Sequence, residues 1–403
     1  MPKVKRERFV CAPDDEVAQA MGFASHAKVP LHALWRPFGR TGAQANVSKT
    51  ASNVTGNANC FPRLTDADLK PGFDLYEDPE HPPQTLKEFK TDSDRRDVGP
   101  KANTIYVVGV GEAESSVPVA AIAQYVEAFY HGIKVTVLPM LPLRSWNDVE
   151  DEPKRKATTK GKGKSGSLSP LGVEVSGSLV RVRARASPDG VGVRQVNLND
   201  MIDGLLARME TLKNAYAILG VTSEDLFEGN DDLFTMGRSY GGSGVALISL
   251  ARDNPALDDV AGDPAAREWS FAGPVSNTPS ATSSPASNTN SIWLYRACCT
   301  AVHELGHCLG MDHCIYFHCF MQGSASLLEA RSQPPYPCPL ELVKMSAALK
   351  WAPEHLRQRE EALRAVLASL SFSRAPGAIS HLAWLTARRQ EQEAKEKEVV
   401  ELV

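Results

Sequence analysis

The sequence predicts an α/β fold in which helices cover a sheet that contains parallel strands. Residues 103–110 and 134–139 are rich in β-branched side chains, as is typical of buried strands. Between them, residues 117–130 place apolar side chains at helical spacing. A strand, a helix and a strand in this succession indicate a crossover that joins two parallel strands.

The elements that follow extend this pattern. Asn199 or Asp200 is a suitable N-cap for a helix over residues 201–213, because either side chain can accept a hydrogen bond from the first turn. The alternating residues 178–185 fit one arm of a hairpin. Further strands are predicted over residues 215–221, 233–236 and 244–251, with a turn over residues 222–227.

A long helix is predicted over residues 292–309. Its apolar side chains recur every four residues, which gives one broad face that can pack on the sheet. His303 and His307 lie largely away from that face. The apolar face consists of Trp293, Ala297, Ala301, Leu305 and Leu309.

Composition divides the chain into one packed domain and several polar segments. Residues 149–175 and 254–290 are rich in charged, Gly, Ser and Pro residues, so we expect disordered insertions there. Residues 1–102 show no sustained period, and we expect a poorly structured region with one short helix near residues 14–21. The domain itself should span residues 103–350, followed by C-terminal helices over residues 351–403.

Charge and hydropathy exclude several classes of protein. The net charge of −4 provides no positive field that would attract nucleic acid. No segment reaches 18 consecutive apolar residues, and the N-terminus has no apolar signal region. We therefore expect no association with a membrane and no partner nucleic acid. The expected location is intracellular, either cytoplasmic or nuclear. The basic run at residues 153–156 fits a nuclear signal, although a solvated segment explains it more simply.

The segment 303–313, HELGHCLGMDH, has the spacing of a metal site. His303 and His307 are one helical turn apart and project from the same face. Gly310 can adopt a positive φ, end the helix and let the chain return His313 to the same point. Three histidines with a free fourth position are typical of catalytic zinc, whereas structural zinc has four protein ligands.

Glu304 follows the first histidine and should lie beside the metal. Its carboxylate could take a proton from zinc-bound water and act as the general base. The simpler alternative is a buried helix that carries histidines for packing. The number of matching residues at this spacing favours the metal site.

The cysteines continue the pattern and indicate a family. Six of the eight cysteines lie around the histidines, and Cys314, Cys319 and Cys338 follow them. With Met321, these residues match C-x4-C-x-M followed by a further cysteine, and the chain here resembles the archaemetzincins, which are metzincin-type zinc peptidases. The resemblance extends to blocks at residues 104–110, 220–227, 244–252 and 321–330.

The resemblance implies a single metzincin-like catalytic domain with a small mixed sheet above the active-site helix. It implies that the three histidines bind a catalytic zinc, that Glu304 is the general base and that Met321 supports the metal from below. The cysteines would hold a second, structural zinc. The strand at residues 244–251 resembles the edge strand along which metzincins bind extended peptides.

One position departs from the family pattern. The fourth cysteine would fall at residue 341, where this chain has Glu341. A carboxylate can bind zinc, so a site of three cysteines and Glu341 is one alternative. His318 is another candidate for the fourth ligand. The third alternative is a set of buried thiols without metal.

Two functions follow from these residues. The first is a zinc metallopeptidase that hydrolyses peptide bonds with a zinc-activated water, and the resemblance suggests aminopeptidase-like trimming of a peptide or protein substrate. The second is a non-catalytic zinc-binding or interaction protein that retains the fold. Glu304 favours the enzyme, because a protein that uses zinc for stability alone has no need of that carboxylate.

Overall fold

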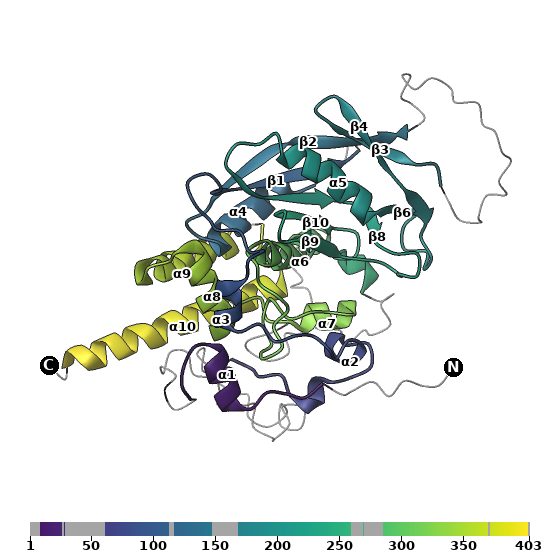
Figure 1. Cartoon of the computed structure of the whole chain (residues 1–403). Coiled ribbons are helices and arrows are strands. Elements are labelled where there is room, and N and C mark those ends of the chain that lie inside the picture. The colour runs from purple at the N-terminus through teal and green to yellow at the C-terminus, as the bar shows by residue number, and fades with distance from the viewer. Residues whose placement is uncertain are drawn as a thin grey trace, which may run out of the picture.

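A seven-stranded mixed sheet forms the centre of the molecule (Figure 1). The computed structural model describes residues 9–25, 28, 61–112, 117–146, 168–258, 269, 285–369 and 371–401. The strand order is β4-β3-β2-β1-β7-β10-β9. The strands are β1 (Thr104–Gly111), β2 (Lys134–Ser145), β3 (Leu171–Val175), β4 (Ser178–Val182), β7 (Ala215–Thr222), β9 (Gly237–Tyr240) and β10 (Val245–Ser249).

The pairing of these strands confirms the α/β class and the predicted parallel crossover. β1 pairs with β2 and β7 in parallel, and β7 pairs with β10 in parallel. The β3–β4 hairpin and the edge strand β9 are attached through antiparallel pairs. The central strands are buried along almost their whole length, because helices cover both faces of the sheet.

Two predicted strand positions were wrong. Residues 222–227, predicted as a turn, include β8 (Asp225–Phe227), which joins β5 (Ala184–Ala186) and β6 (Arg194–Asn197) in a three-stranded sheet. The strand predicted at residues 233–236 begins at Gly237 instead, where β9 pairs with β10. β9 is half exposed and lacks large apolar side chains apart from Tyr240, so hydrophobic periodicity does not reveal it.

Three helices form the layers on the sheet. α5 (Leu198–Met209) covers one face, and α4 (Val119–Phe129) and α6 (Pro285–Cys308) cover the other (Figure 1). The N-cap of α5 is Asn197, whose side chain accepts a hydrogen bond from the Asp200 amide at 3.2 Å. The cap predicted at Asn199 or Asp200 was therefore too late, because the buried Leu198 already belongs to the helix.

Four helices after the histidine segment lie on the side of α6 away from the sheet (Figure 1). They are α7 (Leu327–Ser332), α8 (Pro339–Leu349), α9 (Pro353–Leu367) and α10 (Pro376–Glu401). α9 packs on α4, and α10 packs on α9 and α6. None of the helices in the described ranges combines the length and the apolar character needed to cross a bilayer.

The N-terminal region contains more packed structure than its sequence pattern predicts. The predicted helix is present as α1 (Asp14–Ala20), and η3 (Asp66–Asp68), α2 (Asp74–Glu77) and α3 (Leu86–Thr91) follow it. Phe61 and Phe89 are fully buried. The expectation of a poorly structured region missed these elements, because each short apolar group packs on residues far away in the sequence rather than on its own neighbours.

The two expected insertions fall mainly outside the described residues. Residues 147–167 and most of residues 259–284 are not described. At the margins the predicted boundaries were too wide, since β3 begins at Leu171 and η5 (Pro255–Leu257) and the start of α6 lie within the second segment. The alternating segment predicted as a hairpin arm forms β4, which pairs with β3.

Candidate active site

The end of α6 determines how the three histidines meet. α6 ends at Cys308, and Gly310 has φ of +88°, a conformation that favours glycine. The Met311 amide donates to the Gly306 carbonyl at 3.1 Å, so the chain turns back over the last helical turn. A Cβ at residue 310 would also lie 2.5 Å from Cγ of Arg95. Both backbone conformation and space therefore require glycine here.

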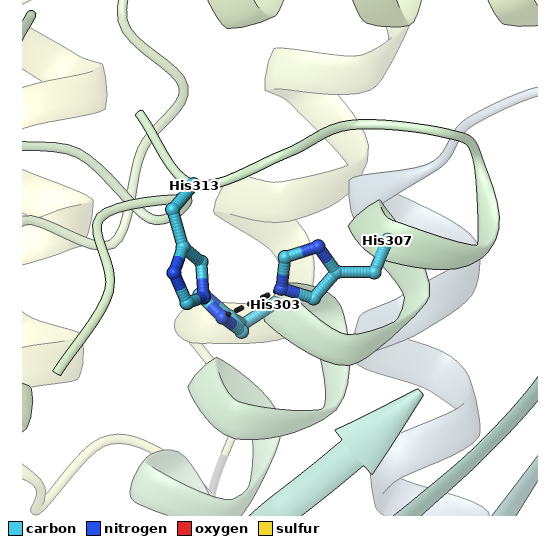
Figure 2. Close-up of side chains that lie close together, drawn as sticks. All are labelled: His303, His307 and His313. Atoms are coloured by element: carbon cyan, nitrogen blue, oxygen red, sulfur yellow. Dashed lines mark hydrogen bonds between the residues drawn. The ribbon is translucent and has the colours of Figure 1, made fainter. Parts of the chain in front are cut away.

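His303, His307 and His313 point toward one another (Figure 2). The ring centroids are 4.8 to 5.3 Å apart, and one nitrogen from each ring lies within 4.8 Å of the others. His303 and His307 direct Nδ1 at the carbonyls of Phe320, at 2.7 Å, and Met311, at 2.6 Å. A carbonyl can only accept a hydrogen bond, so both Nδ1 atoms carry the proton.

This arrangement leaves two lone pairs facing each other. The Nε2 atoms of His303 and His307 are 3.2 Å apart, and in the neutral form of each ring the proton on Nδ1 leaves a lone pair on Nε2. Burial lowers the pKa of His307 to about 3 and that of His313 to about 2, so these rings are neutral. Neutral imidazoles with converging lone pairs fit a divalent metal ion, as catalytic zinc requires.

Glu304 faces the cleft between α6 and the edge strand β9. Its side chain is 7% exposed, and burial raises its pKa above the usual value. A Cβ at Gly237 would lie 3.0 Å from Oε1 of Glu304, so the glycine in β9 leaves room for the carboxylate. A carboxylate of raised pKa beside the three imidazoles is suited to accepting and returning a proton.

A cleft of about 870 Å³ opens over these residues. β9 forms one wall through Gly237, Arg238 and Ser239, and the segment 324–335 forms the opposite wall. The floor contains the three histidines and Glu304. A space of this size admits a peptide segment rather than a small ion alone.

Met321 packs directly against the histidine helix. It is fully buried, and a Cβ at Gly306 would lie 2.4 Å from its sulfur. The Met321 carbonyl accepts a hydrogen bond from the Cys314 amide at 2.8 Å, which closes the loop that carries His313. Gly306, between the first two histidines, therefore allows the methionine to support this part of the helix.

Cys314, Cys319 and Cys338 form a second cluster. Their sulfur atoms lie within 4.8 Å of one another, and Sγ of Cys314 and Sγ of Cys338 are 3.8 Å apart. All three are at most 3% exposed, and the structure contains them as free thiols. Sulfur atoms at this separation match the edges of a tetrahedron around zinc, for which Zn–S is about 2.3 Å.

Glu341 lies beside this cluster and is fully buried. Its Oε1 accepts a hydrogen bond from Nζ of Lys344 at 3.0 Å, while its Oε2 accepts none from the described residues. Burial and the nearby Cys314 sulfur raise the pKa of this carboxyl to about 8, although the ammonium group of Lys344 lowers it in part. Glu341 is not among the residues whose ligand atoms lie within 4.8 Å of one another in this cluster. The Glu341 side chain would therefore have to turn toward the three sulfur atoms in order to bind the same metal.

His318, the other predicted candidate for a fourth ligand, is directed elsewhere. Its Nδ1 is 3.0 Å from Oε1 of Gln322, and its Nε2 is 3.2 Å from Oδ1 of Asp68. Within the described residues it joins no group of metal-ligating atoms with the cysteines. Nε2 attaches the N-terminal region to the loop after His313, and Nδ1 makes a contact within that loop.

Asp74 and His81 reach the histidine site, although the sequence pattern did not indicate them. Oδ2 of Asp74 lies 3.0 Å from Nε2 of His81 and 3.8 Å from Nδ1 of His313. They belong to the N-terminal region, separated from His313 by more than 200 residues and by no recognisable motif. No sequence pattern therefore linked Asp74 and His81 to the histidine segment.

Comparison with known proteins identifies relatives of this chain. It is 27% identical to rat Archaemetzincin-2 over 286 residues, which cover 67% of this chain and 66% of the relative. It is 30% identical to human Archaemetzincin-1 over 180 residues, 43% of this chain and 35% of the relative. The chain is therefore similar to members of the archaemetzincin family. No protein-family model matches it.

A solved structure aligns with part of this chain. The crystal structure of Archaemetzincin from Methanopyrus kandleri aligns with 62% of this chain and 99% of its own, at 19% identity and a TM-score of 0.35. The chain spans slightly less than two thirds of the length of its Archaemetzincin-2 relatives. The similarity to these relatives confirms the resemblance predicted from the cysteine pattern after His313.

Proposed function

We propose that this protein is a zinc metallopeptidase. The observation that carries the proposal is the convergence of three imidazoles that line a cleft, with a buried carboxylate beside them. Bound zinc would supply a Lewis acid that activates water and polarises the scissile carbonyl. His303, His307 and His313 would hold it.

Residues of the chain would carry out the proton transfers and hold the site in place. Glu304 would accept the proton of the attacking water at its carboxylate and donate it to the departing amine. Its raised pKa favours the first of these transfers, because a weaker acid has a stronger conjugate base, which takes the proton of water more readily. Met321 and Gly306 would keep the helix and the His313 loop in register.

The substrate would be a peptide or a protein segment in an extended conformation. The strand predicted as the edge, at residues 244–251, is β10 and lies between β7 and β9, so that prediction was wrong. β9 is the edge of the sheet and lines the cleft, so its outer backbone groups can pair with a peptide strand. Gly237 and Gly241 in and after β9 allow close approach to α6. The aminopeptidase-like trimming suggested by the resemblance is the finer form of this proposal, and peptides with free and acetylated N-termini would distinguish it from internal cleavage.

We also propose a second, structural zinc at Cys314, Cys319 and Cys338. The buried Oε2 of Glu341, which accepts no hydrogen bond from the described residues, supports Glu341 as its fourth ligand. Lys344 would offset part of the negative charge of three thiolates and a carboxylate. Such a site would stabilise the loop that carries His313.

The experiment that tests the catalytic proposal is the Glu304→Gln substitution. Glutamine keeps the shape of the side chain but cannot accept the proton, so we expect peptide hydrolysis to fall by about 10²-fold or more. Zinc content, measured by elemental analysis, should stay unchanged. Glu354→Gln, an exposed carboxylate at the start of α9, is the control and should retain full activity.

The result also separates the enzyme from the second candidate, a non-catalytic zinc-binding protein. Equal hydrolysis by the wild type and Glu304→Gln would contradict the proposed role of this carboxylate. If the wild type binds zinc at the histidines and cleaves none of a broad peptide library, the non-catalytic function is favoured.

A further inference from the structure

Each histidine that binds a metal through one nitrogen needs a partner for the other. Such partners set the tautomer and the orientation of the ring. The carbonyls of Phe320 and Met311 serve His303 and His307 in this way. For His313, the described residues provide no comparable carbonyl, and the polar group that faces its Nδ1 is the carboxylate of Asp74.

We propose that Asp74, held by His81, is the positioning residue for His313. The N-terminal region thereby completes the metal site that the histidine segment begins. Asp74 would accept the Nδ1 proton of His313 and leave Nε2 free for the metal, in a carboxylate–histidine–metal arrangement. The inference rests on the proposed zinc site.

The geometry places one oxygen between two imidazoles. Oδ2 of Asp74 is 3.0 Å from Nε2 of His81 and 3.8 Å from Nδ1 of His313. The rings of His81 and His313 meet edge to face, with centroids 5.3 Å apart. The longer distance exceeds a charge-assisted hydrogen bond by about 1 Å. Hydrogen bonds of this kind are often long in ligand-free structures and shorten in the complex.

The backbone that carries Asp74 is fixed by the opposite side of the site. The Asp74 amide donates to Oε2 of Glu329 at 2.8 Å, and the same oxygen accepts from the Ala325 amide at 2.9 Å. Glu329 is 2% exposed and lies in α7, next to the wall of the cleft. α2 is therefore attached to the segment that follows the third histidine.

Gly323 provides the space in which these groups meet. A Cβ at residue 323 would lie 2.0 Å from Oδ2 of Asp74 and 2.7 Å from Nδ1 of His313. Any other residue would push into the gap between the carboxylate and the imidazole. Residues 74–81 of the N-terminal region thus meet His313 and Gly323 of the loop after α6 at one contact.

The test is the affinity for zinc of Asp74→Asn, measured by competition with a chelating indicator. Asparagine has nearly the same size but no charge, and we expect zinc at the histidines to bind 10- to 100-fold more weakly, as is typical when such a partner is lost. The visible spectrum of the cobalt(II)-substituted protein should change as well, because the spectrum reports the orientation of His313. Glu80→Gln, an exposed carboxylate in the same segment, is the matched control.

Two further variants keep the test decisive if Asp74→Asn affects folding. His81→Gln should weaken zinc binding less than Asp74→Asn, because it acts through Asp74. Gly323→Ala should weaken binding without removing any polar group. Zinc affinity within twofold of the wild type in folded Asp74→Asn, or in both other variants, would overturn the inference. Absence of zinc at the histidines of the wild type would instead refute the proposed function.

Discussion

The histidine and cysteine clusters arise from one stretch of chain but offer different environments. His303, His307 and His313 lie on the floor of a cleft, and all three rings are partly exposed. Cys314 directly follows the third histidine, yet its cluster is fully buried. A metal held by the first cluster can reach a substrate, whereas a metal held by the second can only connect parts of the protein.

The groups around the two clusters differ in charge as well. Burial lowers the pKa of His307 and His313, and backbone carbonyls orient the rings of His303 and His307. The cysteine cluster has a buried ion pair beside it, formed by Glu341 and Lys344, which are 0% and 1% exposed. A buried charge is costly unless it is paired, so the second cluster depends on each of these charges. The following experiments test this contrast.

Removal of metal should have the largest effect. We expect brief treatment with a soluble chelator to abolish peptide hydrolysis while one zinc per chain stays bound, because the cysteines are shielded from solvent. Elemental analysis and activity, followed in the same samples, measure both. Loss of the two ions at the same rate would contradict the expectation that the cysteine cluster is shielded from solvent. Activity with the cysteine-bound ion alone would contradict the expectation that the histidine-bound ion is the catalytic one.

Cys314→Ser should have the next largest effect. We expect zinc content to fall by one ion per chain and the free energy of unfolding to fall by about 4 kcal/mol or more, in the range typical of a lost structural metal. Denaturant unfolding measures the second quantity. Cys299→Ser, a half-buried cysteine outside the cluster, is the control. Unchanged zinc content in Cys314→Ser would favour buried thiols without metal.

Measured at pH 9, above the pKa of about 8 of Glu341, Lys344→Met should cost about 3 kcal/mol of unfolding free energy, because it leaves the Glu341 carboxylate buried without its cation. The double variant Lys344→Met/Glu341→Gln should recover part of this loss. Denaturant unfolding of both variants is the measurement. A single variant as stable as the wild type would mean that Glu341 is protonated or bound to a metal without help from Lys344.

Gly306→Ala should have the smallest effect, about 1–3 kcal/mol, because the added methyl group pushes into the Met321 sulfur. Activity should decrease together with stability, since residue 306 lies between His303 and His307. In the Met321→Ala background the sulfur is absent and the added methyl group has space. The double variant Gly306→Ala/Met321→Ala should therefore be at least as stable as Met321→Ala alone. Equal damage by Gly306→Ala in both backgrounds would mean that the methionine is not the obstacle.

Much of the fold could be predicted because its signals are local. β1, α4 and β2 occur where apolar periodicity placed them, and α6 contains the predicted apolar face. β9 was misplaced because an edge strand that lines a cleft has no such periodicity. The N-terminal region was underestimated because its short apolar groups are buried by distant parts of the chain.

The sequence by itself determined the histidine spacing, the turn at Gly310 and the resemblance to the family, because helix geometry and a positive φ act within a few residues. The tertiary structure alone decided that Asp74 and His81 face His313, and that Glu341 is paired with Lys344 inside the core. The first set of features follows from bonded neighbours. The second depends on packing between segments that are far apart, and no local pattern records which of them will meet.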